Sequence, residues 1–164
     1  MMDARNLWRP EMRRRQRGRG ALLQIPPRPS TDARLSRFTG LLDAIVEGER
    51  ALDAARQAVE GGLPAEAEQE LSKFLTLARP RLEQAGDLPS QYIDLLGQTV
   101  ARALVARSAA WIEHSFDGEP APEALRSAAR ADVAEACGLP ASWLDMKTQA
   151  NLGRLQHVLE LAPA

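Results

Sequence analysis

Aromatic residues are scarce in this chain of 164 residues, at 4% of the total. A core with so few rings must be built from leucine, alanine, valine and isoleucine. That set suits helices that approach each other through small side chains. It suits a β-sandwich poorly, because β-branched and aromatic residues pack best on a pleated sheet. No stretch alternates polar and apolar residues for long enough to predict a strand, so we expect an all-α fold.

Cysteine and histidine are also rare. The single Cys137 excludes an internal disulfide and any site that needs paired thiolates, and we interpret it as a small buried hydrophobe. His114 and His157 lie on different predicted helices, and neither has a His or Cys partner at i+3 or i+4. Glu66 and Glu70 share a helix face, but their place in a first turn is explained by the helix dipole. We therefore predict no metal site and no cofactor.

Motifs for catalysis and for membrane insertion are missing as well. The sequence contains no P-loop, no G-x-G-x-x-G and no G-x-S-x-G elbow. We predict that the protein is not an enzyme and has no small-molecule substrate; a helical enzyme using scattered Arg and Glu is the weakest alternative. No apolar run approaches the roughly 18 residues that span a bilayer, and no hydrophobic segment follows the N-terminal charges. We expect a cytoplasmic protein without a membrane partner.

Charge is distributed unevenly, although the formal net charge is only −1. Residues 1–37 hold ten arginines against three acids, a net charge of +7, whereas the remainder carries 11 basic and 19 acidic residues, a net charge of −8. A basic segment joined to an acidic body indicates an anionic partner or self-association.

Two regions are predicted. Residues 1–29 form an arginine-rich arm with a proline-rich linker, since three prolines within 26–29 cannot continue a helix. Residues 30–164 form a helical domain of roughly five helices, arranged as an antiparallel bundle or as stacked helical hairpins. We expect five helices: one from Ser30 or Thr31 to Gly61-Gly62, one that starts near Pro64, one from Ser90 to about Phe116, one from Pro122 or Glu123 to Gly138, and one that opens over 142–145 and continues through Leu161.

Several details of these helices can be predicted. Ser90 should cap the third helix, and Ser142 with Asp145 should form a capping box for the fifth. Pro80 should kink or split the second helix. In the first helix, heptad-like spacing predicts an inward stripe of apolar residues: Leu35, Phe38, Leu42, Ile45, Leu52 and Val59, broadened by Leu41, Val46 and Ala55.

The arm contains the candidate functional residues. Leu7 and Trp8 predict a hydrophobic anchor that docks in a pocket, either on the helical body of this chain or on a partner, because a merely solubilising arm has little use for them. Five of the seven residues from 13 to 19 are arginine, and none is acidic. Arginine contacts phosphate bidentately and releases counterions, without reading base sequence. The candidate contacts with an anionic partner are Arg9, Arg13, Arg14, Arg15, Arg17 and Arg19.

Two functions remain open from the sequence. The first is a non-enzymatic accessory subunit of a nucleoprotein assembly, of the size and class of the small helical subunits of RNA-guided effector complexes or of phage packaging adaptors. In this first function, the arm of the accessory subunit contacts nucleic-acid phosphates without sequence specificity. The second is a protein–protein adaptor or chaperone-like helical module, whose Trp8 and arginines dock on an acidic partner protein.

Overall fold

The computed structural model describes residues 31–113 and 121–161. The chain divides into two units, residues 1–31 and residues 32–164, and the second unit holds the helical domain. The predicted arm over 1–29, with its linker, lies outside the described residues.

Five α-helices and one short 3-10 helix account for most of the described chain. They are α1 (Thr31–Glu60), α2 (Pro64–Glu83), α3 (Ser90–Ile112), α4 (Glu123–Cys137), η2 (Ala141–Trp143) and α5 (Met146–Leu161). The described ranges contain no strand, and the all-α prediction is confirmed. Gly62, at a φ of +78°, makes the tight turn between α1 and α2.

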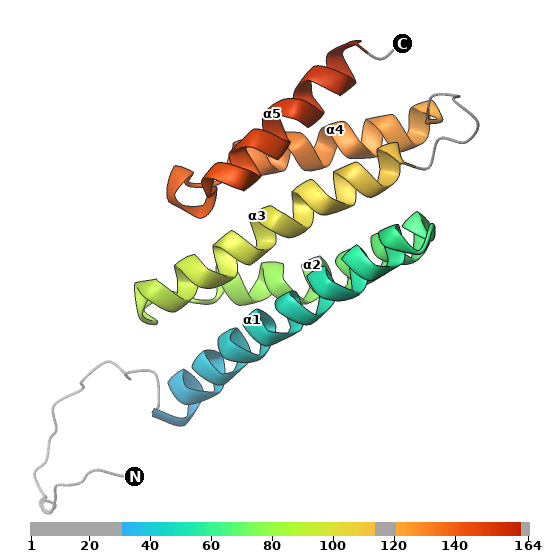
Figure 1. Ribbon diagram of the computed structural model, residues 1–164. Coiled ribbons are helices and arrows are strands. Elements are labelled where there is room, and N and C mark those ends of the chain that lie inside the picture. Colours follow the sequence, from blue (N-terminus) through green and yellow to red (C-terminus); the bar gives the residue numbers. More distant parts are fainter. Residues whose placement is uncertain (1–30, 114–120, 162–164) are drawn as a thin grey trace, which may run out of the picture. The chain divides into compact units, whose positions relative to one another are not determined.

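The helices pack in two layers around α3 (Figure 1). The third helix contacts α2, α4, η2 and α5, and α4 also contacts α5. Phe38 of α1 packs edge-on against Tyr92 of α3, with ring centroids 5.2 Å apart. Figure 1 shows α1, α3 and α5 running in the same direction in one layer, with α2 and α4 behind them. Of the two predicted arrangements, this one corresponds to stacked helical hairpins.

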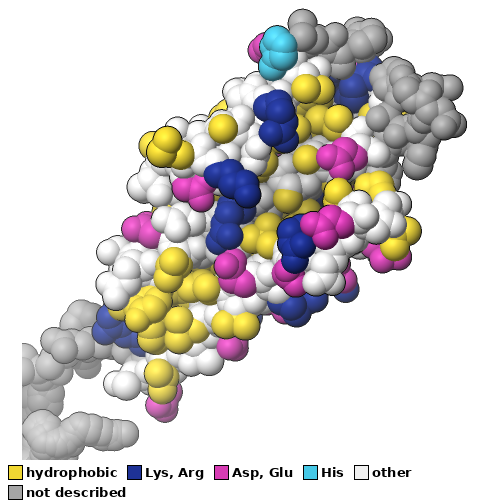
Figure 2. Space-filling view, in the orientation of Figure 1, with side chains coloured by type: hydrophobic (Ala, Val, Ile, Leu, Met, Phe, Trp, Pro, Cys, Tyr) yellow, Lys and Arg dark blue, Asp and Glu magenta, His cyan; other side chains and the backbone are white. Residues whose placement is uncertain are grey.

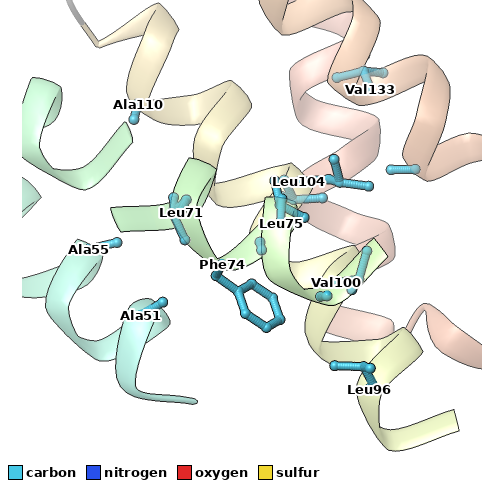
Figure 3. Close-up of a cluster of buried hydrophobic side chains, with 14 of the residues drawn as sticks. Ala51, Ala55, Leu71, Phe74, Leu75, Leu96, Val100, Leu104, Ala110 and Val133 are labelled. Carbon is cyan, nitrogen blue, oxygen red and sulfur yellow. The ribbon is translucent and has the colours of Figure 1, made fainter. Parts of the chain in front are cut away.

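The core is aliphatic, as the composition predicts. Its largest buried side chains come from α1, α2 and α3 and surround the ring of Phe74, which is fully buried (Figure 3). They include Leu41, Leu71, Leu75, Leu96, Val100 and Leu104. Burial of each of these six side chains stabilises the fold by roughly 1.5–3 kcal/mol relative to leaving it in water.

The predicted inner face of α1 is correct only in part. The buried residues of α1 are Leu41, Ala44, Gly48, Ala51 and Ala55. Of the remaining predicted residues, Phe38, Ile45 and Leu52 are partly buried and pack against the core, whereas Leu35, Leu42, Val46 and Val59 are exposed. The reason is close approach: a Cβ at Gly48 would lie 2.3 Å from Thr99 Cγ2 and 2.7 Å from a ring carbon of Phe74. Only small residues fit around Gly48, where α1 approaches α2 and α3, so Leu35, Leu42, Val46 and Val59 lie outside this contact.

Three local predictions also need correction. Ser90 is the first residue of α3 and its side chain makes no cap hydrogen bond; Pro89 stands at the N-cap. Residues 141–143 form η2, so the cap of α5 is Asp145 alone, whose Oδ1 accepts a hydrogen bond from the Thr148 backbone N–H at 2.7 Å. Pro80 lies inside α2, which continues as one helix to Glu83, so the predicted split does not occur.

Candidate interaction face on the helical unit

The described residues contain none of the candidate site residues in the arm. Leu7, Trp8, Arg9 and the arginines of 13–19 all lie outside them. The helical unit itself presents three adjoining features on the layer formed by α1, α3 and α5.

The first feature is an apolar patch formed by Leu35, Leu42 and Val46 of α1 and Leu95 of α3. Their exposed fractions are 59%, 36%, 70% and 45%. Figure 2 shows hydrophobic side chains gathered over the first halves of α1 and α3. Scattered apolar residues are normal on a protein surface, but several on one seam mark an interaction site.

Helical spacing explains why Leu42 and Leu95 share a seam. Arg102 of α3 donates a hydrogen bond to Glu49 of α1 at 3.1 Å, which fixes these two stripes side by side. Leu42 lies seven residues before Glu49, and Leu95 lies seven residues before Arg102. Seven residues are two helical turns, so both leucines lie on the same stripes.

The second feature is an apolar groove of about 390 Å³ between α1, α2 and α3. Its walls are rich in alanine, which lets a partner come close to the backbone. Leu52, Val59 and Leu71 add larger apolar surface, and Arg56, Glu60 and Glu113 supply the polar rim. Arg56 already pairs with Asp53 and Glu60, so the rim charges are balanced within α1. The alanines are Ala55, Ala67, Ala106, Ala109 and Ala110.

The third feature is a smaller hollow of about 230 Å³ between α3 and α5, here called the basic hollow. Three cationic side chains line it, together with a single acid, Asp145. Its apolar part comes from α3, and its polar part also includes Thr148 and Asn151 of α5. The cations are Arg102, Lys147 and Arg154. Such an excess of positive charge contrasts with the acidic composition of residues 38–164.

Charge pairing elsewhere on the unit is mostly local. Arg50 donates hydrogen bonds to Glu47 and Glu70 and thereby lowers the pKa of both carboxyls. Glu70 forms ion pairs with Arg50 and Lys73, and Glu66 takes no part in these pairs. The two glutamates that share a helix face in the sequence therefore do not form a joint cation site. The hydrogen bond from Arg37 lowers the pKa of Asp87 in the same way.

A buried ionic network joins α2, α3 and α4. Arg107 donates to both carboxylate oxygens of Asp132, at 2.7 and 2.8 Å, and to Ser72 Oγ at 2.9 Å. Its guanidinium also stacks over the ring of Trp111, 4.7 Å from the centroid. Asp132 is only 5% exposed. With these groups partnered, the network holds the two layers together and offers no open position to a ligand.

Cys137 and the histidines provide no further chemistry. Cys137 is exposed, which corrects the prediction of a buried position, and Gln156 Nε2 donates to its sulfur at 3.3 Å. The helix turns Ala136 inward instead. His157 is exposed on α5, and His114 lies outside the described residues. Among residues 31–113 and 121–161, no group of three or more His, Cys, Asp or Glu is placed to hold a metal ion.

A polar pocket of about 570 Å³ lies where α1 begins and α2 ends. Arg37 and Arg81 line it opposite Asp32 and Asp43. Arg37 donates to the carbonyl oxygens of Gln84 and Ala85, so it is already engaged in closing the end of α2. Arg81 lies against α1, and a Cβ at position 40 would lie 3.0 Å from its Nε. The pocket has no excess of either charge and converges on no reactive group.

No protein-family model, no curated protein and no solved structure is significantly similar to this chain. Within the part of the chain that the structure describes, no helix combines the length and apolar character needed to cross a membrane. The features that bear on function are therefore the arm's sequence and the face formed by α1, α3 and α5.

Sequence reasoning missed this face because it assigned the largest apolar residues of α1 to the core. A usable signal was present in the small residues at positions 44, 48, 51 and 55, whose spacing of four, three and four residues marks a helix stripe that can approach a neighbour closely. In the basic hollow, Lys147 and Arg154 lie 45 and 52 residues after Arg102, and only the packing of α5 on α3 brings them to it.

Proposed function

We propose that this protein is a non-enzymatic accessory subunit of a nucleoprotein assembly. The helical unit docks on a protein subunit through the apolar patch and the apolar groove. The arginines of the N-terminal arm contact nucleic-acid phosphates. The observation that carries the proposal is the exposure of Leu42, Val46 and Leu95 beside an alanine-lined groove on one helical layer.

Stacked helical hairpins support this role. Repeated helix pairs commonly use one layer of helices as an extended binding surface. The apolar patch and groove lie on such a layer here, and they have the composition of the central part of a protein interface, where charged residues are depleted. The body supplies shape and protein contact, and the arm supplies electrostatic affinity without base readout.

Purification at native ionic strength, with and without nuclease, tests the proposal directly. The full chain should bring down both protein and nucleic acid, and nuclease should release the part held through the arm. In direct binding assays, deletion of residues 1–20 should abolish most nucleic-acid binding and its steep salt dependence. A full-length protein that ignores RNA and DNA at low salt would overturn the nucleic-acid half of the proposal.

The docking half needs its own variant. Val46→Glu places a charge at the most exposed residue of the apolar patch and should weaken capture of the protein partner by about tenfold or more, since a charge buried in an apolar interface is costly to desolvate. Ala131→Glu makes the same change of charge at an exposed position of α4, in the other layer, and should leave capture unchanged. Equal capture by both variants would show that the patch is not the docking surface.

The same exposed apolar surface also favours a second candidate, a protein–protein adaptor whose arm docks on an acidic protein. The two candidates differ in the residue that matters most. In the adaptor, Trp8→Ala costs more binding than the loss of any single arginine, because a buried ring carries most of the energy of such a contact. In the nucleoprotein subunit, each single arginine substitution in the arm costs a similar share of the nucleic-acid affinity.

A further inference from the structure

The basic hollow between α3 and α5 holds cations that the rest of the unit leaves accessible. The Lys147 ammonium forms no ion pair or hydrogen bond within the described residues, and Arg154 donates only to Asn151 Oδ1, at 2.7 Å. Arg102 pairs with Glu49 of α1, whose side chain is 56% exposed. Two of the three cations are therefore available to an anion from outside.

The single acid in the lining has a structural reason to be there. Asp145 accepts the hydrogen bond from the Thr148 backbone N–H and so caps α5. That hydrogen bond is the main cause that lowers its pKa, and the nearby charge of Arg102 lowers it further. Asp145 is thus engaged by α5 itself, while Lys147 and Arg154 project from the first and third turns of the same helix.

The size and lining of the hollow favour a phosphodiester over an acidic helix. An α-helix with its side chains is about 10–12 Å across, too wide for a space of about 230 Å³. A phosphate group with its sugar is small enough. Val105, Ala106 and Ala109 form an apolar floor against which a sugar can lie, while the cations face the phosphate oxygens.

We propose that the basic hollow binds a phosphate group of the nucleic-acid backbone, through Lys147 and Arg154 with Arg102 at its edge. This inference rests on the proposed function and deepens it, since it gives the folded unit a nucleic-acid contact separate from the arm. The hollow and the apolar groove share Ala106 and Ala109. The nucleic acid and the protein partner would therefore meet on neighbouring sides of α3.

The test is the salt dependence of binding by the full chain. Fluorescence anisotropy with a labelled single-stranded RNA, and with DNA of the same sequence, gives the slope of log K against log salt concentration. Each phosphate contact adds roughly −0.7 to that slope for a single strand. Because Lys147 and Arg154 are proposed to hold one phosphate together, the double variant Lys147→Gln/Arg154→Gln should reduce the magnitude of the slope by about 0.7.

A matched control removes two cations from the other layer. Lys73→Gln/Arg130→Gln changes the net charge equally, at positions on α2 and α4 where Glu70 and Glu123 pair with the cations. The control should keep the wild-type slope. All four side chains are at least partly exposed, and circular dichroism should show both variants folded.

Each result has a distinct meaning. Equal slopes for the site variant and the control would overturn the inference and leave the proposed function standing. A wild-type chain that binds neither strand at low salt would overturn the proposed function, and the inference with it. Weaker binding of a poly-glutamate peptide by the site variant than by the control, with equal RNA and DNA slopes for the two variants, would assign the hollow to an acidic protein and so overturn the inference.

Discussion

Gly48→Ala tests the close approach that determines which face of α1 is buried. The added Cβ would lie 2.3 Å from Thr99 Cγ2 and 2.7 and 2.8 Å from two ring carbons of Phe74. Carbon atoms in contact normally stay about 3.5–4.0 Å apart. Thr99 is 2% exposed and Phe74 is fully buried, so neither side chain can move into solvent. The helix, the methyl group or the ring must shift, by roughly 1.2–1.7 Å at the closest contact, to restore that separation.

Two opposing terms decide the magnitude. Overpacking a dense core costs typically about 1–3 kcal/mol, and three compressed contacts place this site in the upper part of that range. Replacing glycine by alanine inside a helix contributes about 1 kcal/mol in favour of the folded state. We expect a net loss of about 1–2 kcal/mol in the free energy of unfolding, or a melting temperature lower by roughly 2–8 °C.

Gly153→Ala provides the matched control. Gly153 also lies inside a helix, but a Cβ there would meet no atom within 4 Å. The same substitution should therefore stabilise the protein by about 0.5–1 kcal/mol. Urea unfolding followed by far-UV circular dichroism compares the two. If both variants gain the same stability, α1 does not approach α2 and α3 through Gly48, and the exposed patch loses its explanation.

A second variant locates the strain in one atom. Thr99→Ser removes the methyl carbon that lies closest to the added Cβ and keeps the hydroxyl that donates to the Leu95 carbonyl oxygen. Combined with Gly48→Ala, it should recover part of the lost stability. A double variant whose two effects simply add would argue against contact between the two positions.

Two further substitutions probe polar groups of the unit. Asp132→Ala leaves the buried Arg107 guanidinium without its carboxylate and should cost roughly 3–5 kcal/mol of unfolding free energy. The double variant Arg107→Met/Asp132→Leu removes both charges and should cost clearly less. A double variant as unstable as the single one would contradict this interpretation of the ion pair. Asp145→Ala removes the cap of α5 and should cost about 1 kcal/mol at neutral pH. Because the pKa of Asp145 is lowered in the folded protein, its contribution is complete above the ordinary aspartate pKa of about 3.9 and is lost as the pH falls through the lowered value. Urea unfolding of wild type and Asp145→Ala should therefore converge in acid, and a difference that persists there would exclude the carboxylate as its source.

The sequence alone determined the fold class and most helix limits. Few aromatic residues, no strand-like alternation and turn signals at Gly61-Gly62 and Gly138 were sufficient to predict five helices. The buried faces of α2 and α3 were also predictable, because Leu71, Phe74 and Leu75 or Leu96, Val100 and Leu104 are large and regularly spaced. The arm's arginines, too, are a property of the sequence, since a charge count needs no fold.

Tertiary structure decided which residues of α1 face the core and which of its apolar residues stay exposed. Hydrophobicity favours burying Leu35, Leu42 and Val59, but the volume available between α1 and its neighbours admits only Gly48 and small residues around it. Steric fit prevails over side-chain hydrophobicity there, so an apolar patch remains exposed. The basic hollow also depends on tertiary structure. Arg102 and Arg154 lie 52 positions apart, and no local pattern can predict that the packing of α5 on α3 will bring their charges to one place.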